Sequence, residues 1–151
     1  MAESVRMTTQ LTAASLSAER LPSEWGQLSW ARTLFRTLIT LAAALAFLQT
    51  VFAGVFLSGH YAALDLHETN ATIANATTLL ATIAAVLAWR AGKGAGWPAA
   101  VCAALFLAEA LEIFMGFSRV LSIHVALGTS IVAAFVVLLL RVWRPASAVP
   151  R

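Results

Sequence analysis

Four long apolar stretches follow one another along the chain, separated by short polar segments. They cover residues 34–57, 66–89, 97–117 and 121–142. Each holds about the 20 residues that an α-helix needs to cross the hydrocarbon core of a bilayer. Because backbone N–H and C=O groups in lipid must be satisfied within the chain, helices are the expected structure at these lengths. The pattern predicts four transmembrane helices.

The short connections between these stretches set their expected arrangement. Helices joined by few residues pack side by side and antiparallel. We therefore expect an all-α, integral membrane protein with an up-down-up-down four-helix bundle over residues 31–144. Residues 1–30, rich in Ser, Thr and Ala, are expected to form a flexible N-terminal tail, and residues 145–151 a short C-terminal tail.

Composition supports the membrane class. The chain is 60% hydrophobic and only 11% charged over 151 residues. A soluble domain of this size could not remove so much apolar surface from water. The single cysteine, Cys102, excludes an internal disulfide and a cysteine-based metal cluster.

The basic residues predict an orientation. Nine of the ten Lys and Arg fall on one side of the predicted bundle: Arg6, Arg20, Arg32, Arg36, Arg90, Lys93, Arg141, Arg144 and Arg151. Only Arg119 falls on the other side. The positive-inside rule then predicts a multi-pass protein of the cell membrane with both termini in the cytoplasm. This topology explains the pI of about 10.0 without nucleic acid. The expected partners are the lipid bilayer and either a larger membrane complex or a second copy of the chain.

Two histidines are the main candidates for chemistry. His67 and His124 stand just inside the second and fourth apolar stretches, at the same end of the predicted bundle. Imidazoles in a membrane mark functional sites by default, because burying them without a partner is costly. One from each of two helices could clamp haem b. The alternative is a pair of interfacial histidines wetted by lipid headgroups.

A weak internal repeat sets these histidines opposite each other. In each half, a polar residue and a glycine precede the outer loop and a histidine opens the next helix. The first half has Gln49, Gly54 and His67, and the second has Glu112, Gly116 and His124. Such a repeat suggests a bundle with pseudo-twofold symmetry.

Other residues near the histidines are candidate metal ligands. A zinc site would need at least a third donor, and His60, Asp65 and Glu68 lie in or near the same outer loop. Since the two acids flank His67 along the chain, their side chains would not all converge easily, which favours haem. His60 is expected to be solvated.

Arg119 and Gly128 could complete a haem site. Arg119, five residues before His124, is either the partner of a haem propionate or a solvated loop charge. Gly128, one turn after His124, removes a side chain from the same face. It either lets a porphyrin lie close to the helix or permits helix–helix contact.

Two carboxyl groups lie within the third apolar stretch. Glu109 and Glu112 are three residues apart and share a helix face. They are either proton-handling acids near the cofactor or carboxyl groups bonded to a neighbouring helix, for example to Gln49 or Asn75. Both interpretations stay open.

The residues around the histidines resemble one half of the haem A synthase family. The resemblance is carried by Leu66-His67, and by the segment from Leu105 through Glu112-Ile-Phe-Met-Gly116 to Ile123-His124-Val-Ala-Leu-Gly128. It covers about residues 34–142. In that family each four-helix half places two histidines at the outer ends of its second and fourth helices. The resemblance thus implies that His67 and His124 ligate a haem.

The chain also departs from that family. The family's glutamate three residues before the first histidine is Leu64 here, and Asp65 stands one residue away from that position. The first outer loop has no cysteine pair, and the chain is half the enzyme's length. We therefore expect a bis-histidine b-type cytochrome in electron transfer or haem handling, without the family's oxidative chemistry. The alternatives are a non-enzymatic accessory subunit of a respiratory complex, and a small proton-coupled transporter that uses Glu109 and Glu112.

Overall fold

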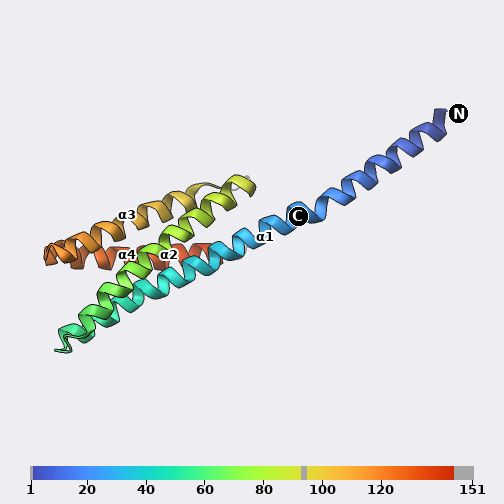
Figure 1. Ribbon diagram of the computed structural model, residues 1–151. Coiled ribbons are helices and arrows are strands. Elements are labelled where there is room, and N and C mark those ends of the chain that lie inside the picture. The colour runs from blue at the N-terminus through green and yellow to red at the C-terminus, as the bar shows by residue number, and fades with distance from the viewer. Residues whose placement is uncertain (1, 93–94, 145–151) are drawn as a thin grey trace.

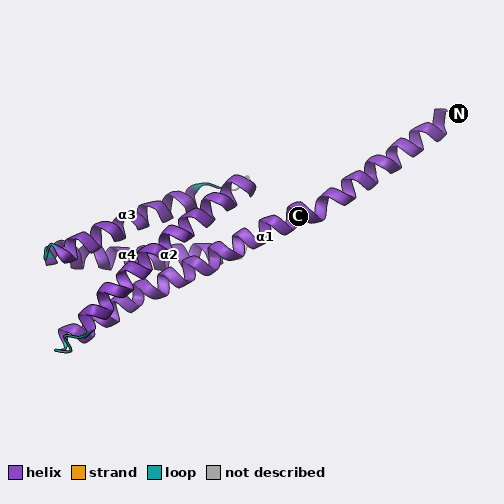
Figure 2. Ribbon diagram, viewed as in Figure 1, coloured by secondary structure: helices purple, strands orange, loops and turns teal. Residues whose placement is uncertain are grey.

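The computed structural model describes the backbone of residues 2–92 and 95–144, and the side chains of residues 30–91 and 95–144. Four helices make up this part of the chain: α1 (Ala2–Leu57), α2 (Ala63–Gly92), α3 (Trp97–Phe117) and α4 (Leu121–Trp143) (Figures 1 and 2). All four contain a segment long and apolar enough to cross a membrane. The predicted all-α four-helix bundle is confirmed. The predicted C-terminal tail, residues 145–151, lies outside the described residues.

The N-terminal region differs from the expected flexible tail. Residues 2–30 continue α1 as helix, which extends well past the bundle (Figure 1). The apolar, membrane-spanning part of α1 begins at Trp30. Ala and Leu account for eight of residues 2–30, and both have high helix propensity. The Ser-, Thr- and Ala-rich composition that predicted a tail is therefore also compatible with a helix.

Tight turns join α1 to α2 and α3 to α4. Gly59 adopts a φ of 96° between α1 and α2, where a side chain would be strained. Arg119 adopts a φ of 56° between α3 and α4, in the left-handed region that few non-glycine residues enter. Pro98 stands in the first turn of α3, where its missing N–H has no intrahelical partner to lose. These turns make consecutive helices antiparallel.

Each helix packs against two others, in the cyclic order α1, α2, α3, α4 and back to α1. The helices that carry His67 and His124, α2 and α4, therefore lie diagonally across the bundle. Small side chains allow the closest approach, and the buried alanines Ala42, Ala46, Ala81, Ala84 and Ala85 lie on α1 and α2. Larger side chains, among them Phe35, Ile39, Leu105, Phe135 and Leu138, fill the rest of the core.

The outer surface of the bundle is apolar. Large hydrophobic side chains from all four helices are more than half exposed, among them Phe47, Leu80, Leu107 and Leu140. A soluble protein rarely exposes contiguous apolar surface on this scale. The surface suits contact with lipid chains, and the four spans make the chain a multi-pass membrane protein.

At one end of the bundle, side chains of α1 and α4 contact each other. Near the start of the first span, the Trp143 indole Nε1–H donates to Thr40 Oγ1 at 3.1 Å, and the Arg36 guanidinium lies 5.3 Å from the centroid of the Trp143 ring. At the opposite end, the α1–α2 and α3–α4 turns stand apart (Figure 1). His67 and His124 lie near this diverging end.

Candidate functional site

The structure brings the two predicted ligand histidines together. The imidazole of His67, on α2, and that of His124, on α4, have ring centroids 6.1 Å apart and planes at 70° to each other. Both side chains are partly buried. Because α2 and α4 are diagonal partners, the two rings reach toward each other across the interior of the bundle.

Each imidazole is held by a backbone carbonyl of the preceding helix. His67 Nδ1 lies 3.2 Å from the carbonyl oxygen of Gln49, and His124 Nδ1 lies 3.1 Å from the carbonyl oxygen of Glu112. A carbonyl only accepts hydrogen bonds, so each Nδ1 carries the proton and donates it. In a neutral ring Nε2 then keeps its lone pair. This is how metal-binding histidines are usually oriented by their surroundings.

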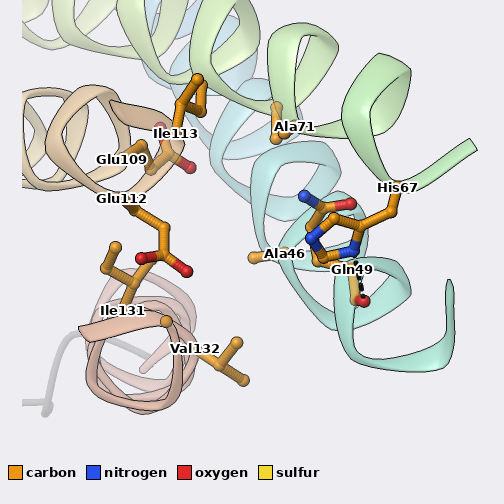
Figure 3. Close-up of a pocket in the computed structure, with 11 residues that line it drawn as sticks. Ala46, Gln49, His67, Ala71, Glu109, Glu112, Ile113, Ile131 and Val132 are labelled. Atoms are coloured by element: carbon orange, nitrogen blue, oxygen red, sulfur yellow. Dashed lines mark hydrogen bonds between the residues drawn. The ribbon is translucent and has the colours of Figure 1, made fainter. Parts of the chain in front are cut away.

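A small cavity of about 60 Å³ adjoins His67. All four helices line it, through Ala46, Gln49, His67, Ala71, Ala74, Glu109, Glu112, Ile113, Gly128, Ile131 and Val132. In Figure 3, His67 and Gln49 stand on one side of this space and Glu109 and Glu112 on the other. Its volume suits one or a few water molecules. It thus joins both predicted acids to one of the histidines.

Asn70 fixes the side chain of Gln49. The Asn70 amide Nδ2 donates to the Leu45 carbonyl at 3.0 Å and to Gln49 Oε1 at 2.8 Å. Asn70 is only 6% exposed, so these bonds satisfy a polar group that would otherwise be costly in lipid. The sequence analysis did not identify this role for Asn70. Its position three residues after His67 was the only available signal.

Glu109 is bonded to a neighbouring helix. The Asn75 amide Nδ2 lies 3.0 Å from the Phe106 carbonyl oxygen and 3.5 Å from Glu109 Oε2. Glu109 is 6% exposed. One of the two alternatives for this residue, a bond to Asn75, is thus present in the structure. The contact does not exclude a proton-handling role, because Glu109 also lines the cavity.

Glu112 contacts His124 through its side chain as well as its backbone. Glu112 Oε1 lies 3.1 Å from His124 Nδ1, while Oε2 is buried and has no hydrogen-bond partner among the described residues. Gly128 makes this position accessible, because a Cβ on Gly128 would lie 2.6 Å from Glu112 Oε1. The space that Gly128 leaves is therefore filled by the Glu112 carboxylate.

The remaining candidate residues stay at the surface. Arg119 and His60 are exposed in the two outer turns, and Asp65 and Glu68 are exposed near the start of α2. Within residues 30–91 and 95–144, no three His, Cys, Asp or Glu side chains are grouped so as to hold a metal ion. The zinc alternative is thus not supported by an assembled donor set.

Comparison of the chain with known protein families, with curated proteins and with solved structures finds no match. The functional argument consequently rests on the contacts of the site itself. The resemblance to one half of haem A synthase stays an expectation from the residue pattern.

Proposed function

We propose that this chain is a small haem-binding membrane protein in which His67 and His124 are the two axial ligands of a haem b. The observation that carries the proposal is the pair of imidazoles from diagonal helices with ring centroids 6.1 Å apart, each with its Nδ1 bonded to a carbonyl. That arrangement leaves two Nε2 atoms for an iron ion. Four-helix bundles commonly hold cofactors between side chains of facing helices.

The separation of the rings suits axial ligation. Two imidazoles that bind one iron through Nε2, each at about 2 Å, have ring centroids about 6 Å apart. The observed separation is 6.1 Å. The 70° angle between the ring planes is compatible with this geometry, because rotating a ring about its bond to the metal leaves the separation unchanged.

Both proposed ligands are present, but the bundle lacks the room that a porphyrin needs. The cavity of about 60 Å³ is too small for a macrocycle. Haem binding therefore requires the α1–α2 and α3–α4 hairpins to move further apart near the histidines. They already diverge at that end, while the contact between Trp143 and Thr40 joins them at the other. We propose that the haem enters at the diverging end.

The chemistry proposed for this haem is electron transfer or haem handling. A haem with two protein ligands has no open position on its iron and supplies one-electron redox chemistry. Leu64 stands where the haem A synthase family has a glutamate, and the first outer turn lacks that family's cysteine pair. Haem oxidation is therefore not proposed.

The distribution of basic residues indicates how the site is oriented in the membrane. We propose that the protein lies in the cell membrane with both termini in the cytoplasm, which puts the histidines near the outer surface. Arg119, exposed in the α3–α4 turn five residues before His124, is proposed to pair with a haem propionate. A partner for electron transfer would be another membrane protein or a second copy of this chain.

An absorption spectrum tests the proposal directly. The protein is produced in cells supplied with a haem precursor, purified in detergent and compared with His67→Ala and His124→Ala. We expect a Soret band and the α and β bands of a six-coordinate haem in the wild type. The two alanine variants should lose the pigment or show five-coordinate spectra.

His60→Ala is the matched control, because His60 lies in an exposed turn at the same end of the bundle. It should keep the wild-type spectrum. A colourless wild type that resists reconstitution with hemin would overturn the proposal. A pigment that survives both His67→Ala and His124→Ala would do the same.

A second candidate function is proton-coupled transport. It is favoured by the cavity, which Glu109 and Glu112 line together with His67. Carboxyl groups inside a membrane commonly mark proton pathways. Reconstitution in liposomes with a pH-sensitive dye tests it: proton flux that Glu109→Gln and Glu112→Gln abolish, in a colourless protein, would favour this function over haem binding.

A further inference from the structure

The end of the bundle opposite the histidines carries basic residues without acidic partners. Five exposed arginines lie there, at the start of the first span and at the ends of α2 and α4: Arg32, Arg36, Arg90, Arg141 and Arg144. Among residues 30–91 and 95–144, no carboxylate pairs with any of them, and the acids of these ranges lie near the start of α2 and in the second half of α3. The nearest acid before Arg32 in the sequence is Glu24, eight residues away. The described part of the chain thus leaves this positive charge unbalanced.

Tryptophans mark the depth of these arginines in the membrane. The tryptophans of residues 30–91 and 95–144 all lie at this end of the bundle, and all are exposed: Trp30, Trp89, Trp97 and Trp143. Tryptophan is enriched where the hydrocarbon core of a bilayer meets the headgroups. The arginines therefore lie at the level of the lipid phosphates.

Contacts with α4 hold one of these arginines in place. The Trp143 indole Nε1–H donates to Thr40 Oγ1 at 3.1 Å, and the Thr40 hydroxyl donates to the carbonyl oxygen of Arg36 at 2.7 Å. The Arg36 guanidinium lies 5.3 Å from the centroid of the Trp143 ring. Stacking on a ring uses the face of a guanidinium and leaves the N–H groups along its edge for hydrogen bonds. Those paired donors match two oxygens of a phosphate.

Two further arginines border the same place. Arg32 stands one turn before Arg36 and shares its face of α1, and Arg144 follows Trp143 directly at the end of α4. We call the surface formed by these four residues the α1–α4 rim. Arg141 lies outside it, because it is two residues before Trp143 and successive helical residues are about 100° apart. Arg141 thus falls on the opposite face of α4.

We propose that the α1–α4 rim binds the phosphate of an anionic phospholipid, with Arg36 as its main donor. Clusters of basic residues beside a membrane span attract anionic lipids. The depth of the rim favours a lipid headgroup over free phosphate. Phosphatidylcholine carries its own ammonium group, which the arginines repel, whereas phosphatidylglycerol does not. The proposal is independent of haem binding, since the rim and the histidines lie at opposite ends of the bundle.

Native mass spectrometry of the full chain, purified and delipidated in a neutral detergent, tests the proposal. The wild type should retain dioleoylphosphatidylglycerol at concentrations at which dioleoylphosphatidylcholine is lost, and equimolar inorganic phosphate should not displace the bound lipid. Arg36→Gln should weaken the apparent affinity for phosphatidylglycerol by at least about tenfold, because it removes charge-assisted hydrogen bonds. Arg36→Lys keeps the charge but not the paired donors, and should recover only part of the loss.

Arg141→Gln is the matched control, because it removes the same charge at the same end from the other face of α4. It should weaken the affinity by about twofold at most, as expected for an exposed charge without a direct contact. Equal losses in Arg36→Gln and Arg141→Gln would show that the whole basic end attracts lipid without a defined site, and would overturn the proposal. Equal retention of the two lipids, full recovery by Arg36→Lys, or displacement by inorganic phosphate would overturn it as well.

Discussion

The imidazoles of His67 and His124 lie with their centroids 6.1 Å apart, although the helices that carry them do not pack against each other. Each ring is hydrogen-bonded to a backbone carbonyl of the helix that precedes its own. The contact across the diagonal is what distinguishes a pair of possible ligands from two separate interfacial histidines.

Gly116 should be as important for the position of His124 as any ligand contact. A Cβ at this position would lie 3.0 Å from His124 Cε1 and 3.2 Å from Nδ1, so Gly116→Ala requires the ring to shift by a few tenths of an ångström. We expect this variant to retain less haem than the wild type, measured as the ratio of Soret to protein absorbance. Gly54→Ala, at the related position in α1, should retain the wild-type ratio. Equal retention by both variants would show that His124 has room to shift.

Asn70 should matter for stability. Asn70→Ala removes two hydrogen bonds and leaves Gln49 Oε1 and the Leu45 carbonyl with fewer partners inside the bundle. A buried polar group left unpaired costs about 1–3 kcal/mol. We expect the free energy of unfolding in detergent to fall by an amount in this range, measured by denaturant titration. Thr69→Ala, at an exposed neighbouring position, should change it little. A loss no larger in Asn70→Ala than in this control would contradict the assigned role.

The α1–α2 contact should tolerate no larger side chain at its centre. Ala42 is fully buried, whereas Ala44 is exposed on the same helix. Forcing extra methylene groups into a packed core typically costs about 1–3 kcal/mol. Ala42→Leu should therefore lower the unfolding temperature, followed by circular dichroism in detergent. Ala44→Leu adds the same groups toward lipid and should leave the temperature near its wild-type value. The opposite order would mean that α1 presents a different face to α2.

The proposed orientation can be tested with single cysteines. Cys102 is fully buried, so the native thiol should give little background with a membrane-impermeant maleimide, and Cys102→Ala provides a parent without it. Ser58→Cys and Ser118→Cys, in the two exposed outer turns, should be labelled in intact cells. Ala95→Cys, in the connection between α2 and α3, should be labelled only after the cells are opened. Labelling of Ala95→Cys in intact cells would reverse the proposed topology.

The apolar pattern by itself determined the number, approximate length and order of the spans, and placed the two histidines near the starts of the second and fourth. It could do so because the cost of leaving backbone or polar side chains in lipid is large and depends only on the local sequence. This argument does not apply to residues 2–30, because the first span begins at Trp30. Outside the membrane, a polar segment is as compatible with a helix as with a tail, and α1 continues through it.

The tertiary structure alone decided which side chains meet. Lipid-facing and bundle-facing positions are both apolar, so the pattern does not fix how each helix is rotated about its axis. Three contacts depend on that rotation. They are the proximity of the His67 and His124 rings, the hydrogen bond from Asn70 to Gln49, and the close approach of Glu112 to Gly128. These contacts join residues 16 to 57 positions apart, and only packing of the four helices brings them within reach.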